Sequence, residues 1–121
     1  MKYLLSAVLF FLTIHINAQK EFRQIKESKK EKIIVYGSDS CHSCLDTKDF
    51  LTKRNIKFIY YDIDLNTKKE QEMLEKLQNT NIPINTLNLP VIDNKGAIYL
   101  NNGNLNEFLK FLDKNIKKDE N

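Results

Sequence analysis

The stretch KIIVYGSDSCHSCLDTKDF, residues 32–50, passes from a short apolar run into a helix-like pattern. The β-branched run 32–36 ends at a glycine, which is typical of a buried strand. Over 42–54 the spacing of the apolar residues favours a helix. Cys41 and Cys44 are the only cysteines of the chain and lie at the start of that helix. Because residues three apart share a helix face, the stretch predicts a strand–helix unit with two neighbouring thiols.

The rest of the chain alternates strand and helix patterns before a hairpin and a closing helix. A strand is expected over 56–63, with apolar residues on both faces as in a central parallel strand, followed by a helix from Thr67 with a capping box to Glu70. A polar loop over 79–90 then leads to a hairpin, whose strands begin at Pro90 and cover 97–100 around a turn at 93–96. The closing helix is expected to be capped by Asn104, with Glu107 three residues on. The last helix carries the clearest apolar stripe: Leu105, Phe108, Leu109, Leu112 and Ile116. A strand–helix–strand unit implies parallel strands with a right-handed crossover. The expected fold class is therefore α/β, with a mixed four-stranded sheet made of a parallel β-α-β unit plus an antiparallel hairpin, flanked by helices.

The first 18 residues have the pattern of a secretory signal peptide. A short positive start, Met1-Lys2, precedes the apolar run 3–16, and Ala18 provides a small residue for cleavage. The run is shorter than the roughly 20 residues that span a bilayer, and an uncleaved anchor is the alternative. We expect export to the periplasm or the extracellular space, with membrane contact only if the segment stays uncleaved. The expected organisation is a signal peptide over 1–18, a polar connector or short helix over 19–31, a folded domain over 32–116 and a frayed tail over 117–121.

The charge of the chain indicates no nucleic-acid partner. The protein has 121 residues, which suits one small domain, and a formal net charge of +3. Lysines and glutamates alternate over 20–32, a pattern typical of a solvated arm or helix. Export would allow the cysteine pair to be oxidised, because disulfides persist outside the cytosol.

The start of a helix is a special environment for Cys41. Unpaired N–H groups and a partial positive charge there favour a thiolate over a thiol, and such a sulfur leaves readily from a mixed disulfide. A protonated His42 would add to this effect, whereas Asp39 and Asp46 would oppose it. Cys44 lies one turn further in and is expected to be less exposed. Its expected role is to attack the mixed disulfide at Cys41 and release the substrate.

The cysteine pair has competing interpretations. A static disulfide between Cys41 and Cys44 would close a very small loop, which removes little entropy from the unfolded chain. Zinc normally takes four ligands, and the exported chain adds only His42 and nearby aspartates to the two cysteines. We therefore expect redox exchange and no metal site. The competing functions are a metal or iron–sulfur carrier in which two chains share a cluster through Cys41, and a non-catalytic module that binds extended peptides.

Pro90 opens the first strand of the hairpin, where it cannot donate a hydrogen bond to the sheet. A cis Leu89–Pro90 bond would turn the backbone of Leu89 outward and leave its polar groups free to pair with an extended chain. An ordinary trans proline at the end of a loop is the interpretation that the local sequence favours. Pro83 is the rival position, but no clear strand begins directly after it.

The order of strand, CxxC at a helix start, strand, helix, proline-led hairpin and final helix resembles the glutaredoxin branch of the thioredoxin fold. The resemblance covers residues 32 to about 116 and includes Leu89-Pro90-Val91. It implies that Cys41 is the nucleophile, Cys44 the resolving thiol and Pro90 a cis-proline opposite them. The activity implied is that of an exported thiol–disulfide oxidoreductase with protein thiols or disulfides as partners.

The sequence departs from glutaredoxins at positions that bind glutathione. His42 and Ser43 replace the usual proline and aromatic residue, and the stretch 38–40 (SDS) replaces the usual basic residue. Asn102-Gly103 stands where glutaredoxins have a Gly-Gly pair. We therefore expect a monomer that uses a protein disulfide rather than glutathione, without a cofactor, and that exchanges with a separate redox partner. Four residues are expected to contact the substrate: His42, Ser43, Leu89 and Pro90.

Overall fold

The computed structural model of the protein describes residues 32–117. The chain divides into two units, and all described residues belong to the second, Lys32–Asn121. The predicted signal peptide over 1–18, the connector over 19–31 and all but the first residue of the predicted tail lie outside the described residues. Between residues 32 and 117, no helix is both long enough and apolar enough to cross a membrane.

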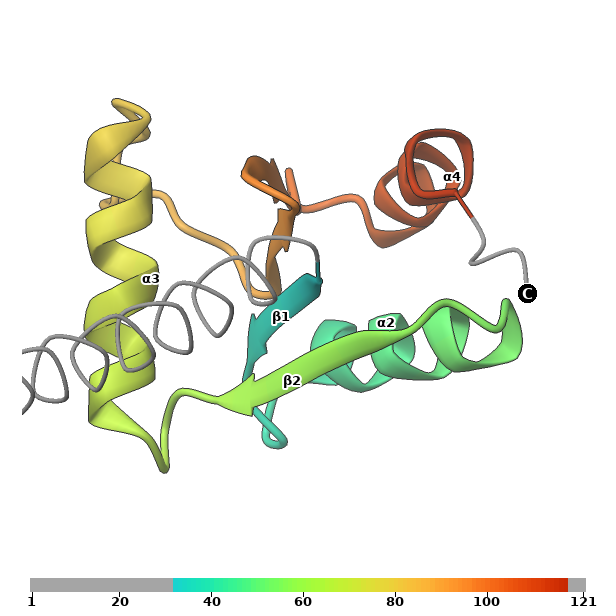
Figure 1. Ribbon diagram of the computed structural model, residues 1–121, viewed down its shortest axis with the longest axis horizontal. Coiled ribbons are helices and arrows are strands. Elements are labelled where there is room, and N and C mark those ends of the chain that lie inside the picture. The colour runs from blue at the N-terminus through green and yellow to red at the C-terminus, as the bar shows by residue number, and fades with distance from the viewer. Residues whose placement is uncertain (1–31, 118–121) are drawn as a thin grey trace, which may run out of the picture. The chain divides into compact units, whose positions relative to one another are not determined.

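The described residues form one mixed four-stranded sheet with helices on both faces (Figure 1). The strand order is β2-β1-β3-β4, in which β1 pairs parallel with β2 and antiparallel with β3, and β3 pairs antiparallel with β4. The elements are β1 (Ile33–Gly37), α2 (His42–Lys53), β2 (Phe58–Asp62), α3 (Thr67–Asn79), β3 (Val91–Asn94), β4 (Ala97–Leu100) and α4 (Leu105–Asn115). This topology confirms the predicted α/β fold, with its parallel unit and its antiparallel hairpin.

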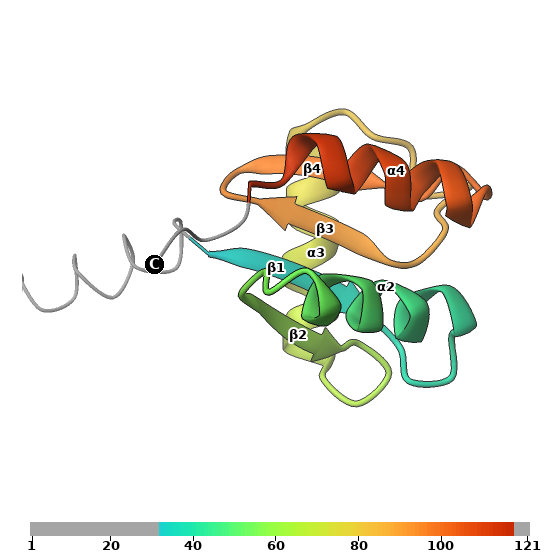
Figure 2. The same ribbon diagram turned by 90° about the vertical axis from the view of Figure 1, so that its right-hand side faces the viewer.

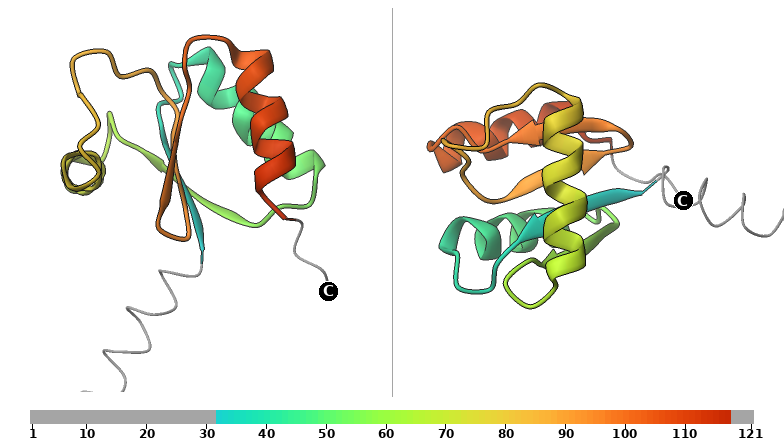
Figure 3. Two further views of the ribbon diagram at one scale, coloured as in Figure 1. Left: turned by 90° about the horizontal axis from the view of Figure 1, so that it is seen from above. Right: turned by 90° about the vertical axis from the view of Figure 1, so that its left-hand side faces the viewer.

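Apolar side chains form one hydrophobic cluster on each face of the sheet. Helices α2 and α4 lie on one face and α3 lies on the other (Figure 2, Figure 3). Neighbouring residues of β1 alternate between the clusters: Val35 packs with α2 and α4, and Ile34 packs with α3. The predicted stripe of the last helix is confirmed, because its residues all contribute to the first cluster: Leu105, Phe108, Leu109, Leu112 and Ile116.

The expectation of a central strand over 56–63 is wrong. β2 is an edge strand with half-buried residues, whereas β1 is internal to the sheet and buried throughout. The apolar residues of β2 face both sides because helices cover both faces of the sheet. Tyr60 packs on the α2–α4 cluster and Tyr61 on the α3 cluster. Apolar residues on both faces of a strand thus show that helices cover both faces of the sheet, and they do not show whether the strand is central or at the edge.

Side-chain amides cap the amino-terminal ends of α3 and α4. α3 is capped by Asn66, one residue before the predicted Thr67, and the Asn66 side chain accepts from the Lys69 N–H at 3.2 Å. An asparagine side chain in this position satisfies an N–H that has no partner within the helix. The predicted cap of α4 is confirmed, because the Asn104 side chain accepts from the Glu107 N–H at 3.2 Å.

The hairpin turn is tighter than the predicted 93–96. β3 continues to Asn94, so that Lys95 and Gly96 alone connect it to β4. Their φ angles are 54° and 102°, the pair of positive values that a two-residue turn between twisted strands requires. The Asp93 side chain also accepts from the Gly96 N–H at 2.7 Å, which fixes the turn to the strand.

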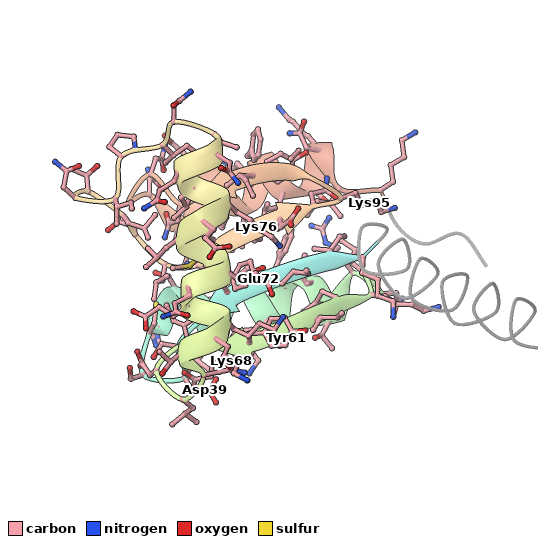
Figure 4. The ribbon with its side chains drawn as sticks, turned by 60° about the vertical axis from the view of Figure 1, so that its left-hand side comes forward. Asp39, Tyr61, Lys68, Glu72, Lys76 and Lys95 are labelled. Atoms are coloured by element: carbon pink, nitrogen blue, oxygen red, sulfur yellow. The ribbon has the colours of Figure 1, made fainter. Side chains whose placement is uncertain are left out.

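A polar network joins α3 to the sheet through the buried hydroxyl of Tyr36. This hydroxyl donates to Glu72 and accepts from Lys76, both at 2.6 Å. Lys76 also pairs with Asp93 at 2.7 Å, and Lys69 pairs with Glu72 at 2.6 Å. Figure 4 shows Glu72 and Lys76 one turn apart on α3. The helix is therefore attached by ion pairs as well as by apolar packing.

Burial sets the protonation states within this network. Burial, and after it the hydrogen bond to Glu72, raises the pKa of Tyr36 above its usual range. Burial alone would also raise the pKa of Glu72, but hydrogen bonds from Lys69 and Tyr36 outweigh it and lower the pKa of Glu72. At neutral pH the phenol is thus protonated and the carboxylate ionised, as their hydrogen bond requires.

We expect Lys76→Met to lower the free energy of unfolding by about 1–3 kcal/mol, because it leaves the Asp93 carboxylate without its cation. The value lies below that for a fully buried pair, since the Lys76 side chain is 30% exposed. Urea unfolding at neutral pH measures the change. Lys68→Met is the matched control on the exposed side of α3 and should change stability by less than about 0.5 kcal/mol. Equal losses in both variants would contradict a specific role for Lys76.

Candidate functional site

Cys41 lies at the amino-terminal end of α2, directly after the loop that follows β1. It is the N-cap residue, and its carbonyl oxygen accepts from the backbone N–H groups of Cys44 and Leu45, both at 3.2 Å. Its side chain is a half-buried free thiol. This confirms the predicted placement of Cys41 at a helix start, where the unpaired N–H groups favour negative charge.

Cys44 is fully buried one turn further along α2. Burial, and after it the hydrogen bond between the two cysteine side chains, raises the pKa of the Cys44 thiol well above its usual value. A hydrogen bond with the backbone of Ser38 acts in the opposite direction without cancelling the effect. The pair is therefore asymmetric: an incoming sulfur can reach Cys41, whereas Cys44 is shielded and protonated at neutral pH. The predicted lower exposure of Cys44 is confirmed.

Gly37, the last residue of β1, makes room for the buried cysteine. A Cβ atom at this position would lie 2.9 Å from Tyr60 Cε2 and 3.0 Å from both Cys44 Sγ and Tyr60 Oη. Non-bonded carbon atoms optimally lie about 3.5–4.0 Å apart, so any larger residue would displace one of these neighbours. The missing side chain lets β1, α2 and β2 close around Cys44.

The loop before β3 brings Leu89 and Pro90 next to the first cysteine. The Leu89–Pro90 peptide bond is cis, as the resemblance implies, and Pro90 is fully buried. Cys41 Sγ lies 4.0 Å from the Leu89 carbonyl oxygen. The expectation that the polar groups of Leu89 are free is wrong for this carbonyl, because the buried Asn101 side chain donates to it at 3.1 Å. Asn101 also accepts from the Gly103 N–H at 3.0 Å, which holds the amide in place.

Carboxylates surround the loop that precedes the first cysteine. Asp62 accepts from the Asp39 N–H at 3.2 Å, and the Asp64 carboxylate accepts from the hydroxyls of Ser38 and Ser40. The loop has no basic residue, and the end of β2 and the residues after it add two further acids, Asp62 and Asp64, next to it. Lys48 pairs with Asp39 at 3.2 Å, so that three carboxylates and one ammonium give this side of the approach to the thiol a net negative charge.

The two residues between the cysteines make few contacts. The His42 side chain is 93% exposed, and its Nε2 lies 4.0 Å from an Asp46 carboxylate oxygen. Ser43 is half-buried, and its carbonyl accepts from the Thr47 hydroxyl at 2.7 Å. Of the residues predicted to contact substrate, the structure brings Leu89 beside Cys41 and leaves His42 in solvent. Within residues 32–117, no three His, Cys, Asp or Glu side chains lie close enough together to hold a metal ion.

Comparison with known proteins agrees with the fold described above. Residues 33–87 match the family model for glutaredoxin. A similar solved structure is the dithiolic glutaredoxin 2-C-Grx1 from the pathogen Trypanosoma brucei brucei, with 22% sequence identity and a TM-score of 0.53 over 73% of this chain and 84% of that chain. The protein has a glutaredoxin-like thioredoxin fold. The search of curated proteins found no match to the chain.

Several residues of the candidate site could not be predicted from the sequence. The sequence marks Gly37 only as a strand end, and nothing local distinguishes Tyr60 from Tyr61 beside it. Asn101 follows the last strand and reaches the site only because β4 pairs with β3. The one available signal was the alternation of side chains along β2, which places Tyr60 and Asp62 on the same face of the sheet.

Proposed function

We propose that the protein is a thiol–disulfide oxidoreductase that exchanges disulfides with protein thiols through Cys41 and Cys44. The observation that carries the proposal is the asymmetry of the pair. The first thiol is half-buried at a helix start, 4.0 Å from the Leu89 carbonyl, and the second is fully buried one turn away. The glutaredoxin match over residues 33–87 supports the reaction class, and the dithiolic glutaredoxin of similar fold supports the use of two cysteines.

The proposed mechanism assigns one step to each sulfur. The Cys41 thiolate attacks a substrate disulfide, which forms a mixed disulfide beside Leu89 and Pro90 and releases the first substrate sulfur. The Cys44 thiolate then attacks the Cys41 sulfur, so that the second substrate sulfur leaves and takes up a proton. Burial of Cys44 protects it from solution thiols while it remains within reach of its neighbour.

Exchange should depend on the two cysteines in different ways. We expect Cys41→Ser to lower the reduction of insulin or of a peptide disulfide at least about a hundredfold, because no accessible thiol remains. Cys44→Ser should instead trap mixed disulfides, visible by mass spectrometry as adducts that dithiothreitol removes. Equal residual activity in the two variants would refute the assignment of roles. A Cys41 that resists alkylation at neutral pH would favour the non-catalytic peptide-binding module.

We propose a protein disulfide rather than glutathione as the substrate, because of charge. Glutathione carries a net negative charge, and the carboxylates of Asp39, Asp62 and Asp64 border the loop before the nucleophile. A peptide that carries basic residues beside its cysteine would be attracted to the same surface. We also propose that the protein acts as a monomer and without a cofactor.

Reversal of one charge should change this preference. We expect Asp39→Lys to raise the rate with a glutathione-containing disulfide, relative to a neutral peptide disulfide, by about three- to tenfold at low ionic strength, and the gain should shrink with added salt. Glu75→Lys makes the same charge change at an exposed position of α3 and should leave the ratio unchanged. A ratio that is the same in all three proteins would show that charge does not select the substrate.

We further propose that the protein acts in the periplasm or outside the cell, on the basis of the signal-peptide pattern over 1–18. Amino-terminal sequencing of the protein expressed with its full chain tests this directly. Cleavage should give a mature protein that begins at Gln19. A protein that keeps Met1 and fractionates with membranes would indicate the uncleaved anchor instead.

A further inference from the structure

The hydroxyl of Tyr60 is a buried polar group that lacks a partner. Tyr60 belongs to the edge strand β2 and is half-buried as a whole, but its Oη atom is shielded from solvent. Among residues 32–117 this oxygen makes no hydrogen bond of normal geometry, although the Asp39 carboxylate lies close enough to act on it as an acceptor. Buried hydroxyls are nearly always paired, since an unmade hydrogen bond costs stability. An unpaired one beside a candidate site therefore calls for an explanation.

The Tyr60 hydroxyl and the buried Cys44 sulfur both pack against Gly37 and fill the position that a side chain there would need. Tyr60 Oη and Cys44 Sγ each lie 3.0 Å from the point that a Gly37 Cβ atom would occupy. The two atoms are therefore separated by no more than twice that distance. They do not form a hydrogen bond in this structure, and glycine places no side chain between them that would prevent their approach to hydrogen-bond length.

Charged groups around this hydroxyl keep it protonated. Burial is the largest cause that raises the pKa of Tyr60 above its usual range, followed by the charge of the Cys44 sulfur, the charge and hydrogen-bond acceptance of the Asp39 carboxylate, and the charge of Asp62. Asp39 and the Cys44 thiolate are therefore competing acceptors for this hydroxyl. From α2, the Lys48 ammonium lies 3.9 Å above the Tyr60 ring and 3.2 Å from an Asp39 oxygen, so it offsets part of that negative charge. A phenol that keeps its proton is a hydrogen-bond donor. A donor is what a buried thiolate needs.

We propose that the Tyr60 hydroxyl donates a hydrogen bond to the Cys44 thiolate during the resolving step; this inference rests on the thiol–disulfide exchange proposed above. Cys44 first loses its proton to water, and its thiolate then attacks the Cys41 sulfur of the mixed disulfide. The Cys44–Cys41 bond forms as the Cys41–substrate bond breaks, and the substrate sulfur leaves with the electron pair and takes a proton from water. Tyr60 keeps its own proton. In the reverse reaction the same hydrogen bond stabilises the Cys44 sulfur as it leaves.

Tyr60→Phe removes only the oxygen and tests this role. We expect the resolving step to slow about tenfold at neutral pH, so that the mixed disulfide with a model peptide accumulates and is caught by acid quenching and mass spectrometry. In a Cys41→Ser background, the pH titration of Cys44, followed by the ¹³Cβ chemical shift of the labelled residue, should move about one unit toward higher pH, because its thiolate has lost a donor. A merely structural role for Tyr60 would not move this pH profile.

Tyr61→Phe is the matched control. Tyr61 is the next residue of β2 and packs on the α3 face of the sheet, the face toward the viewer in Figure 4. Its loss of a hydroxyl should leave both the resolving rate and the pH titration of Cys44 unchanged. A ring-fluorinated tyrosine at position 60 keeps the hydroxyl and makes it a stronger donor, and it should accelerate resolution.

Three outcomes separate this inference from the proposed function. An unchanged resolving rate and an unchanged pH titration of Cys44 in Tyr60→Phe would overturn the role of Tyr60 while exchange itself persists. In the Cys44→Ser background, the rate of mixed-disulfide formation reports Cys41 alone and should be the same with and without Tyr60→Phe. If no mixed disulfide forms in either protein, the proposed function fails. The pH titration of Cys44 then still decides whether Tyr60 donates to it.

Discussion

The structure depends on close packing at the end of β1, where a glycine meets a buried sulfur. Gly37 has no side chain, and the positions it leaves vacant are bordered by Cys44 of α2 and Tyr60 of β2. Because these three elements meet there without a gap, Cys44 is removed from water although it is only one helical turn from the exposed end of the helix. One turn of helix thus separates two thiols whose surroundings differ in solvent access, hydrogen bonding and charge. That difference gives two chemically similar residues two distinct steps in the proposed exchange.

The remainder of the site is held by elements that are distant in the sequence. Leu89 reaches Cys41 because β3 pairs with β1 in the middle of the sheet, and Asn101 reaches the Leu89 carbonyl because β4 pairs with β3. The sheet in turn is fixed by two different kinds of contact. Apolar side chains attach α2 and α4 on one face, whereas α3 on the other face adds the ionic network around Tyr36 to its apolar contacts. A site assembled this way is as rigid as the sheet that carries it, which suits a reaction between sulfur atoms at fixed positions.

Predictions from the sequence succeed where the relevant forces are local. The buried strand β1, the position of Cys41 at a helix start and the stripe of α4 all follow from patterns within one element. The cis bond before Pro90 follows from the resemblance to glutaredoxins and not from local sequence, which favours a trans bond. The prediction for β2 fails because apolar residues on both faces fit an edge strand under two helices as well as a central strand. The prediction of a free carbonyl at Leu89 fails because its hydrogen-bond donor, Asn101, follows the hairpin and no local pattern indicates this contact.

The sequence by itself determined the order of the elements, the α/β class and the placement of two thiols one turn apart, because hydrophobic periodicity and capping act over a few residues. Only the tertiary structure decided which thiol is buried to what extent, which carbonyl lies beside Cys41 and which tyrosine faces Cys44. Those properties arise where β1, β2, α2 and the loop before β3 meet, and desolvation and hydrogen bonding there depend on atoms that no local pattern brings together. The alternation of β2 makes the point in one pair of residues: Tyr60 and Tyr61 are chemically identical neighbours, and the sheet alone directs one to the cysteines and the other to α3.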